Sequence, residues 1–331
     1  MNKVITIKCA LFLILYFFSG RLLLAQDLDR TQERVSIPIG KYQIDGLLLL
    51  PKTSGKKAAI IFIGGSGEWE IVDSYLQNPA KSYADQLLYY GAKLENVAFL
   101  FLNKRGMGKS TGKWRKIGIE ERADDALAAF KFLQQHPQID PDKIGIIGHS
   151  QGGWIAQLAA SRNPKVAFSV AFAGPAMSVY DQTILNDRKI WQHCEGLTEA
   201  QMEKKLRKRK LELGLGKAIG GIIGGEAGHW KRLSRYNHDM ALKQLKTPTL
   251  FVFGEYDLIV PAQENLDYLQ QLFSHNIPHH INYYTQTKMD HFMREREELC
   301  GPLPWTMETP PPFSEGLRDF LTGWIQHKVG H

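Results

Sequence analysis

The stretch that decides the fold is residues 143–161, which read KIGIIGHSQGGWIAQLAAS. Residues 143–148 have the apolar pattern of a short buried strand, and residues 153–161 predict a helix with small side chains. Between them lies the G-x-S-x-G motif Gly148-His149-Ser150-Gln151-Gly152. A strand that turns sharply into a helix at a serine exposes the hydroxyl above the sheet edge, and glycines are needed because no side chain fits beside that turn. The stretch therefore predicts a nucleophile elbow at Ser150.

A serine is a weak nucleophile at its ordinary pKa, so Ser150 needs a general base, and that base needs an acid to hold its tautomer. Residues 249–257 read TLFVFGEYD, an apolar strand that ends in acids. We predict that Asp257 is the acid, because a tight turn after the strand faces it toward the same sheet edge as Ser150. Glu255 is the alternative.

The predicted base is His291, in the segment Lys288-Met289-Asp290-His291-Phe292-Met293. This segment is a polar loop directly after the last predicted strand, which contains residues 279–284. His149 adjoins Ser150, but the elbow geometry points its ring away from the nucleophile. The other histidines after Ser150 lie in the helical segment, at a helix end, at a strand start or at the carboxyl terminus: His193, His229, His238, His275, His279, His280, His327 and His331.

Acyl transfer also needs two preorganised donors for the oxyanion. One is predicted to be the backbone amide of Gln151, at the positive end of the helix after the elbow. The other is expected in the glycine-rich loop at 64–68, GGSGE, where the amide of Ser66 is the first choice and that of Gly65 the second.

The order of elements predicts a doubly wound α/β fold with a mostly parallel sheet. A hairpin is expected over 33–50. The later strands are apolar throughout, which indicates burial on both faces, and helices alternate with them. We predict strands at 58–63, 97–102, 143–148, 166–173 and 249–253, and helices at 75–90, 119–135 and 154–161.

The alternation is interrupted by residues 176–246, which are mostly helical in character. An insertion after a sheet strand begins at the carboxyl edge of the sheet, where ligands bind, so we expect a cap over Ser150. Its glycine-rich part, 214–225, fits either a mobile lid hinge or a loosely packed loop. The predicted organisation is a signal peptide (1–25), a first core part (26–175), a helical cap (176–246) and a second core part (247–331).

Several of these segments together resemble the α/β-hydrolase superfamily, in particular its bacterial esterase and serine-aminopeptidase-like branch. The matching pieces are residues 63–67, 103–112, 147–153, 254–257 and 290–291. The resemblance implies an α/β-hydrolase fold and a triad in the order Ser150, Asp257, His291. The chain has Asn103-Lys104-Arg105-Gly106 where the family usually has Asp-x-Arg-Gly, a change that we expect to be structural.

The first residues have the charged, apolar and small-residue order of a secretory signal. Lys3 and Lys8 precede the apolar run at 9–18, and Ala25 precedes polar residues. We therefore predict export to the periplasm or beyond. Membrane anchoring by residues 9–25 is the alternative. Removal of 1–25 lowers the formal net charge from +7 to +4, because the segment holds three basic residues and no acid.

Much of the remaining positive charge lies in residues 204–210, KKLRKRK. The run lacks aromatic residues and continues a helical pattern from 198 to 213, so we interpret it as a solvated helix face and not as a nucleic-acid site. Two cysteines remain after 1–25, Cys194 and Cys300, and the sequence does not show whether they pair. No metal-ligand spacing is present.

The sequence thus predicts an exported serine hydrolase of carboxylic esters that uses no metal or organic cofactor. Its partner is a small ester or a short peptide, and membrane contact is expected only through an uncleaved amino terminus. One alternative is an aminopeptidase-like or acyl-peptide-type serine peptidase, in which Glu68 or an acid of the cap, such as Glu226, pairs with the substrate amine. The other is a non-catalytic binding protein on a hydrolase scaffold. The sequence predicts neither the specific substrate nor the oligomeric state.

Overall fold

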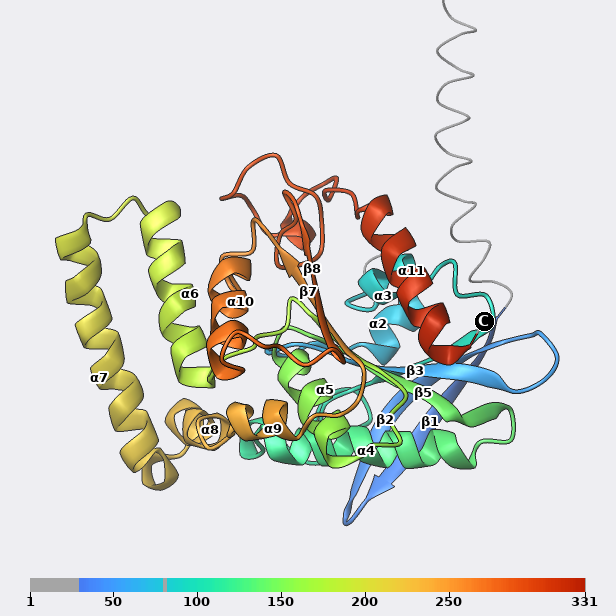
Figure 1. Cartoon of the computed structure of the whole chain (residues 1–331). Coiled ribbons are helices and arrows are strands. Elements are labelled where there is room, and N and C mark those ends of the chain that lie inside the picture. Colours follow the sequence, from blue (N-terminus) through green and yellow to red (C-terminus); the bar gives the residue numbers. More distant parts are fainter. Residues whose placement is uncertain (1–29, 80–81, 331) are drawn as a thin grey trace, which may run out of the picture.

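A computed structural model of the chain describes residues 30–79 and 82–330 (Figure 1). Within this part, eight strands form one sheet in the spatial order β1-β2-β4-β3-β5-β6-β7-β8. The first two strands form the predicted hairpin, β2 pairs antiparallel with β4, and all later pairs are parallel. The strands are β1 (Arg30–Ile39), β2 (Tyr42–Pro51), β3 (Lys57–Ile63), β4 (Val97–Leu102), β5 (Ile139–His149), β6 (Ser169–Phe172), β7 (Thr249–Gly254) and β8 (Ile281–Gln286).

Both faces of the sheet are covered by helices, as the fully apolar strands predict. Successive residues of β3 point to opposite faces, so that Ile61 joins one apolar cluster and Ile60 the other. The first cluster includes α4 (Ile119–Gln135), α5 (Gln151–Arg162) and α10 (Ala262–Leu272). The second includes α2 (Val72–Gln77), α3 (Asp85–Tyr90) and α11 (Glu315–Val329). Figure 1 shows α4 and α5 on one side of the sheet and α3 and α11 on the other.

The prediction of one helix over 75–90 is wrong. The chain instead forms α2 and α3, with the break after the carboxyl cap at Asn78. Pro79 follows directly, and a proline lacks the backbone N–H that would continue the helix. The break brings Tyr83 to the sheet edge, where it takes part in the site described below.

Residues between β6 and β7 are mostly helical, and the structure forms no strand in this fully described interval. The helices are α6 (Val179–His193), α7 (Glu199–Ile223), α8 (Gly225–Leu233) and α9 (His238–Gln244). Helix α9 packs against α5, and its Ala241 and Leu242 belong to the core. The segment leaves the sheet at the carboxyl end of β6; that it closes over Ser150 stays a prediction.

The glycine-rich stretch 214–225 is neither a loop nor a hinge along most of its length, because α7 continues to Ile223. A Cβ on Gly220 would lie 2.1 Å from the carbonyl oxygen of Ala227 in α8, so glycine permits the close packing of the two helices. The turn itself is confined to Gly224 and Gly225, whose φ angles are +74° and +54°. Both alternatives from the sequence therefore placed too much of this stretch in irregular structure.

Cys194 and Cys300 form a disulfide with a Cα–Cα distance of 5.6 Å, which answers a question that the sequence left open. It joins the end of α6 to the long segment between β8 and α11. The predicted signal peptide, residues 1–25, lies outside the described residues. In the part of the chain that the structure describes, no helix has the length and apolar character needed to cross a bilayer.

Candidate active site

The elbow forms where predicted, between β5 and α5. Ser150 has φ +55° and ψ −123°, a strained conformation for a residue with a side chain. Its amide donates to the carbonyl of Phe172 on β6 over 2.9 Å. A Cβ on Gly148 would lie 1.9 Å from the carbonyl oxygen of Gly152, and one on Gly152 would lie 2.1 Å from that of Ile63. These contacts explain why the motif needs both glycines.

Asp257 lies in the turn after β7, and only 2% of its surface is exposed. Its Oδ1 accepts hydrogen bonds from the amides of Ile259 and Val260, each at 2.8 Å. Its Oδ2 is 2.8 Å from Nδ1 of His291. The two amides hold the carboxylate and orient its second oxygen toward the imidazole. The alternative acid, Glu255, is exposed and accepts from the amide of Lys288, so the structure places it away from this pair.

His291 is buried in the loop after β8. The loop is fixed by the neighbouring Asp290, whose Oδ1 accepts from the amides of Phe292 and Arg294 at 2.8 and 3.0 Å. Because Nδ1 of His291 faces Asp257, Nε2 is the nitrogen left for a substrate proton. The rings of His291 and His149, the residue before Ser150, have centroids 5.0 Å apart. The structure thus brings the three predicted catalytic residues to one edge of the sheet.

The glycine-rich loop after β3 runs beside Ser150. A Cβ on Gly65 would lie only 3.0 Å from Cβ of Ser150, so this backbone lies close to the serine. The amide of Gly65 already donates to the hydroxyl of Tyr83 over 3.1 Å. Ser66, the next residue, is exposed. Gln151 is the first residue of α5, so its amide has no acceptor within the helix.

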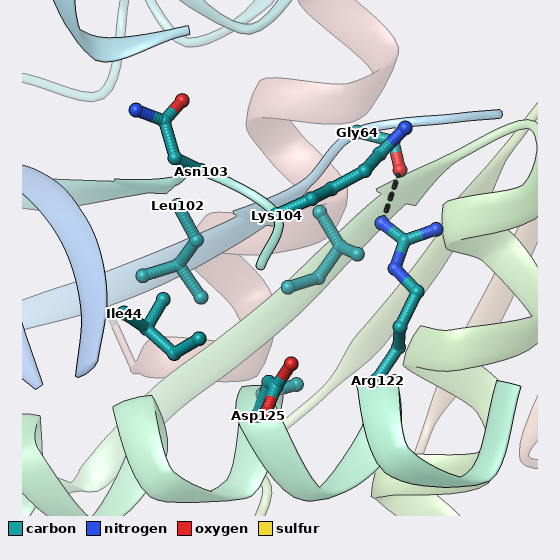
Figure 2. Close-up of a pocket in the computed structure, with 9 residues that line it drawn as sticks. Ile44, Gly64, Leu102, Asn103, Lys104, Arg122 and Asp125 are labelled. Atoms are coloured by element: carbon teal, nitrogen blue, oxygen red, sulfur yellow. Dashed lines mark hydrogen bonds between the residues drawn. The ribbon is translucent and has the colours of Figure 1, made fainter. Parts of the chain in front are cut away.

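Two buried basic side chains bond this loop, and the sequence-based prediction did not include them. Nη1 of Arg122, on α4, donates to the side chain of Gln151 at 2.6 Å, and Nη2 donates to the carbonyl of Gly64 at 2.9 Å. Lys104 donates to the carbonyl of Gly67 at 2.5 Å. Figure 2 shows both long side chains extending toward the start of the loop. They line a small pocket together with Ile44, Ile63, Gly64, Leu102, Asn103, Asp125 and Ala126.

Burial lowers the pKa of both side chains. It lowers the pKa of Arg122 to about 10, with the nearby Asp125 carboxylate opposing the shift. Burial, together with repulsion from Arg122, also lowers the pKa of Lys104 well below its ordinary value. The backbone carbonyls of Gly64 and Gly67 are thus held by two buried basic side chains. In a trans peptide the N–H points opposite to the C=O, so holding the Gly64 carbonyl also orients the Gly65 amide.

A second chain of contacts involves His149, which the sequence analysis set aside. Its Nε2 is 2.7 Å from the carbonyl oxygen of His291, and its Nδ1 contacts the hydroxyl of Tyr83. A carbonyl only accepts, so Nε2 carries the proton and Nδ1 accepts from Tyr83. Burial, and the proximity of His291, lower the pKa of His149 to about 3, so the ring stays neutral. Both ring nitrogens are engaged by these contacts, so the ring connects the loop of His291 with Tyr83.

The two acids considered for binding a substrate amine share one partner. Arg115, in the short helix η2 (Trp114–Lys116), lies 3.1 Å from Glu68 and 3.0 Å from Glu226. Glu68 belongs to the glycine-rich loop after β3 and Glu226 to α8. The guanidinium therefore bridges the loop and the helical segment, and both carboxylates are engaged by it.

A model of the family described as BAAT / Acyl-CoA thioester hydrolase C terminal matches residues 127–294, just over half of the chain. The chain belongs to this family. The matched region contains the elbow, Asp257 and His291. Membership confirms the resemblance to the α/β-hydrolase superfamily and its esterase and peptidase-like branch, and it identifies the chain as a hydrolase of that superfamily.

The curated relatives match this chain only over short stretches. A polyketide transferase of Stachybotrys chlorohalonatus is 30% identical over 107 residues, 31% of this chain and 35% of that protein. A prolyl oligopeptidase of Galerina marginata is 33% identical over 81 residues, 23% of this chain and 11% of that protein. The chain spans no more than 35% of the length of either relative.

Solved structures cover far more of the chain. An esterase of Pyrococcus furiosus superposes with a TM-score of 0.60 and 18% identity, covering 92% of this chain and 94% of that one. Est1E of Butyrivibrio proteoclasticus, solved with bound ferulic acid, superposes with a TM-score of 0.57 and 16% identity, covering 90% of this chain and 100% of that one. At these identities the likeness shows the fold alone, and it confirms the predicted α/β-hydrolase architecture.

Proposed function

We propose that the chain is an exported serine hydrolase that cleaves carboxylic esters through an acyl-enzyme intermediate. One observation carries the proposal. A serine held in a strained elbow shares a sheet edge with a buried histidine, and the Nδ1 of that histidine lies 2.8 Å from a buried carboxylate. A strained, half-buried serine at the same sheet edge as an oriented imidazole is the arrangement that nucleophilic acyl transfer requires.

In the proposed reaction, Oγ of Ser150 attacks the ester carbonyl while its proton passes to Nε2 of His291. Asp257 stays ionised and stabilises the imidazolium. Collapse of the tetrahedral intermediate breaks the bond to the alcohol, which leaves with that proton. Water then attacks the acyl-serine, gives a proton to His291, and the second collapse returns the proton to Ser150 and releases the carboxylic acid.

The negative charge on the former carbonyl oxygen is assigned to the amides of Gln151 and Ser66. The engagement of the Gly65 amide by Tyr83 favours Ser66 over Gly65 as the second donor. Arg122 supports both sides of this oxyanion site, because it bonds the side chain of Gln151 and the backbone at Gly64. Removal of one such donor in a serine hydrolase typically costs 10²–10³ in kcat.

The ion pairs of Glu68 and Glu226 favour ester cleavage over aminopeptidase activity. An aminopeptidase needs a carboxylate to bind the substrate ammonium, and both of these candidates pair with Arg115. A non-catalytic binding protein is disfavoured because such proteins have no use for a strained serine next to an Asp–His pair. Backbone strain of this kind persists only where the surroundings maintain it.

The proposal of export has two supports. One is the order of residues at 1–25, and the other is the Cys194–Cys300 disulfide. Disulfides persist in oxidising compartments and are rare in the reducing cytosol.

The test is steady-state kinetics on a panel of esters that differ in acyl length, with acyl thioesters and aminoacyl amides included. Ser150→Ala should lower kcat by up to about 10⁶-fold on the best ester. Ser36→Ala, at an exposed strand position, is the control and should keep the wild-type rate. Hydrolysis of aminoacyl amides without esters would favour the peptidase, and activity retained by Ser150→Ala would refute the proposal.

A further inference from the structure

Helix α7 has one face that packs against the protein and one that does not. Met202, Leu206, Leu213 and Gly220 are its buried residues, at helical spacing along one side. The indole N–H of Trp230 in α8 donates to the carbonyl of Leu213 at 2.8 Å, so α8 lies against this side. Figure 1 shows α7 at the outer edge of the molecule, with α6 between it and α10. The opposite side of α7 therefore faces solvent.

The second half of that outer side is apolar. Its large side chains follow one another at intervals of four, four, three and one residues, which places them on one stripe of a helix. Their exposed fractions run from 42% to 88%, and they make up five of the ten large hydrophobic side chains that are exposed among the described residues. We call these residues the apolar stripe: Leu211, Leu215, Ile219, Ile222 and Ile223.

The first half of the same side is cationic. Lys204, Arg207 and Lys208 are exposed and continue the stripe toward the amino end of α7 at the same helical spacing; we call them the basic end. Lys208 lies 3.9 Å from Glu212. In the described parts of the chain, no ion-pair partner is found for Lys204 or Arg207. The basic run is thus a solvated helix face, as predicted, but it adjoins an exposed apolar surface.

We infer that this face of α7 docks onto the surface of an anionic phospholipid membrane. A helix with exposed leucine and isoleucine beside lysine and arginine lies in the interfacial plane, where the apolar side chains enter the headgroup boundary and the cations meet lipid phosphates. This goes beyond the sequence-based expectation, which limited membrane contact to the amino terminus.

A lipid surface fits this face better than a second copy of the chain does. Two parallel α7 helices would oppose their basic ends, and like charges at close range are unfavourable. Two antiparallel helices would place each basic end on the partner's apolar stripe and remove its charges from water at a cost. An anionic bilayer can bind the basic end through its phosphates and the apolar stripe through its acyl chains at the same time.

The test is flotation of the full-length protein with vesicles of phosphatidylglycerol and phosphatidylcholine, compared with phosphatidylcholine alone. Leu211→Ser/Ile222→Ser/Ile223→Ser should lower the partition coefficient on anionic vesicles by about tenfold or more, because burial of each apolar side chain is lost. Lys204→Glu/Arg207→Glu should lower the same partition coefficient, measured at low salt, by up to about a hundredfold. The matched control is Leu76→Ser/Met240→Ser/Leu303→Ser, which alters three exposed apolar residues elsewhere and should bind like wild type.

Hydrolysis of a small soluble ester, measured for every variant, checks that folding is retained and should stay unchanged. Equal flotation of the apolar-stripe variant and the control triple would overturn the inference, as would binding that does not depend on phosphatidylglycerol. Concentration-dependent dimers in sedimentation, abolished by the stripe substitutions and without vesicle binding, would overturn it in favour of a second copy. Neither result bears on the proposed ester chemistry, which the Ser150→Ala kinetics test separately.

Discussion

Nε2 of His149 donates a hydrogen bond of 2.7 Å to the main-chain carbonyl of His291. The residue before Ser150 therefore holds the backbone of the proposed general base. The other ring nitrogen of His149 contacts the hydroxyl of Tyr83, which accepts from the Gly65 amide. One neutral imidazole thus joins, through Tyr83, the glycine-rich loop after β3 to the loop that holds His291.

Loss of the Tyr83 hydroxyl should loosen both loops without removing a group that touches substrate. We expect Tyr83→Phe to lower kcat by about tenfold with little change in KM, since loss of about one hydrogen bond corresponds to that factor. Tyr89→Phe is the matched control, because its hydroxyl makes only a 3.4 Å contact with the Phe313 carbonyl. Indistinguishable kcat values for the two variants would show that the chain through His149 has no role in turnover.

His149 also makes the stability of the fold depend on pH. Its pKa in the folded chain is about 3, below the ordinary 6.5, so the unfolded chain binds the proton first as the pH falls. The stabilisation is complete above about pH 6.5 and is lost progressively toward pH 3. His149 should therefore account for a decrease of about 2 kcal/mol in the free energy of unfolding between pH 7 and pH 5.

Urea denaturation of wild type, His149→Gln and His327→Gln at the two pH values measures this contribution. The His149 variant should show a pH dependence smaller by about 2 kcal/mol. The control replaces an exposed histidine of α11 and should match wild type. The same pH dependence in all three proteins would contradict the assignment.

Asn103 stands where the superfamily usually has aspartate, and its contacts explain the change. Its Nδ2 donates to Asp45 at 2.9 Å and to Glu70 at 2.6 Å, while its Oδ1 accepts from the amide of Ile71. Asn103→Asp would put a third carboxylate against two others and remove both donors. We expect a loss of about 3 kcal/mol in the free energy of unfolding. Asn276→Asp, at an exposed position, is the control, and an equal Tm for the two variants would disprove this account.

The disulfide should contribute to stability by restricting the unfolded chain. Cys194 and Cys300 are separated by 106 residues, a long loop for which the expected contribution is about 4 kcal/mol. Cys194→Ser/Cys300→Ser should therefore lower the urea midpoint, and dithiothreitol should lower it for wild type but not for the variant. A wild-type midpoint that dithiothreitol does not change would mean that the bridge contributes little.

The sequence was sufficient for the parts of the site that depend on local pattern. The elbow, the acid after β7 and the histidine after β8 each follow an apolar strand, so the parallel sheet alone gathers them at one edge. The sequence could not indicate contacts between side chains that are far apart along the chain and meet only through tertiary packing. Tyr83 meets His149 across 66 residues, and Arg122 meets Gly64 across 58.

Neither of those contacts leaves a local signal, because a tyrosine and an arginine in helical surroundings look like ordinary surface residues. The break before Tyr83 does have a local signal, because Pro79 directly follows the carboxyl cap of α2. The glycine-rich end of α7 is a second difference between the prediction and the structure, because it is helical. Glycines usually indicate irregular structure, but here Gly220 serves the close contact with Ala227.

The central claim is that Ser150 is the nucleophile. A fluorophosphonate probe reacts with an activated serine, and peptide mass spectrometry of the labelled protein locates the adduct. We expect one adduct on Ser150 in the wild-type protein, much slower labelling of His291→Ala, and none in Ser150→Ala. An adduct on another residue, or equal labelling of wild type and Ser150→Ala, would contradict the account.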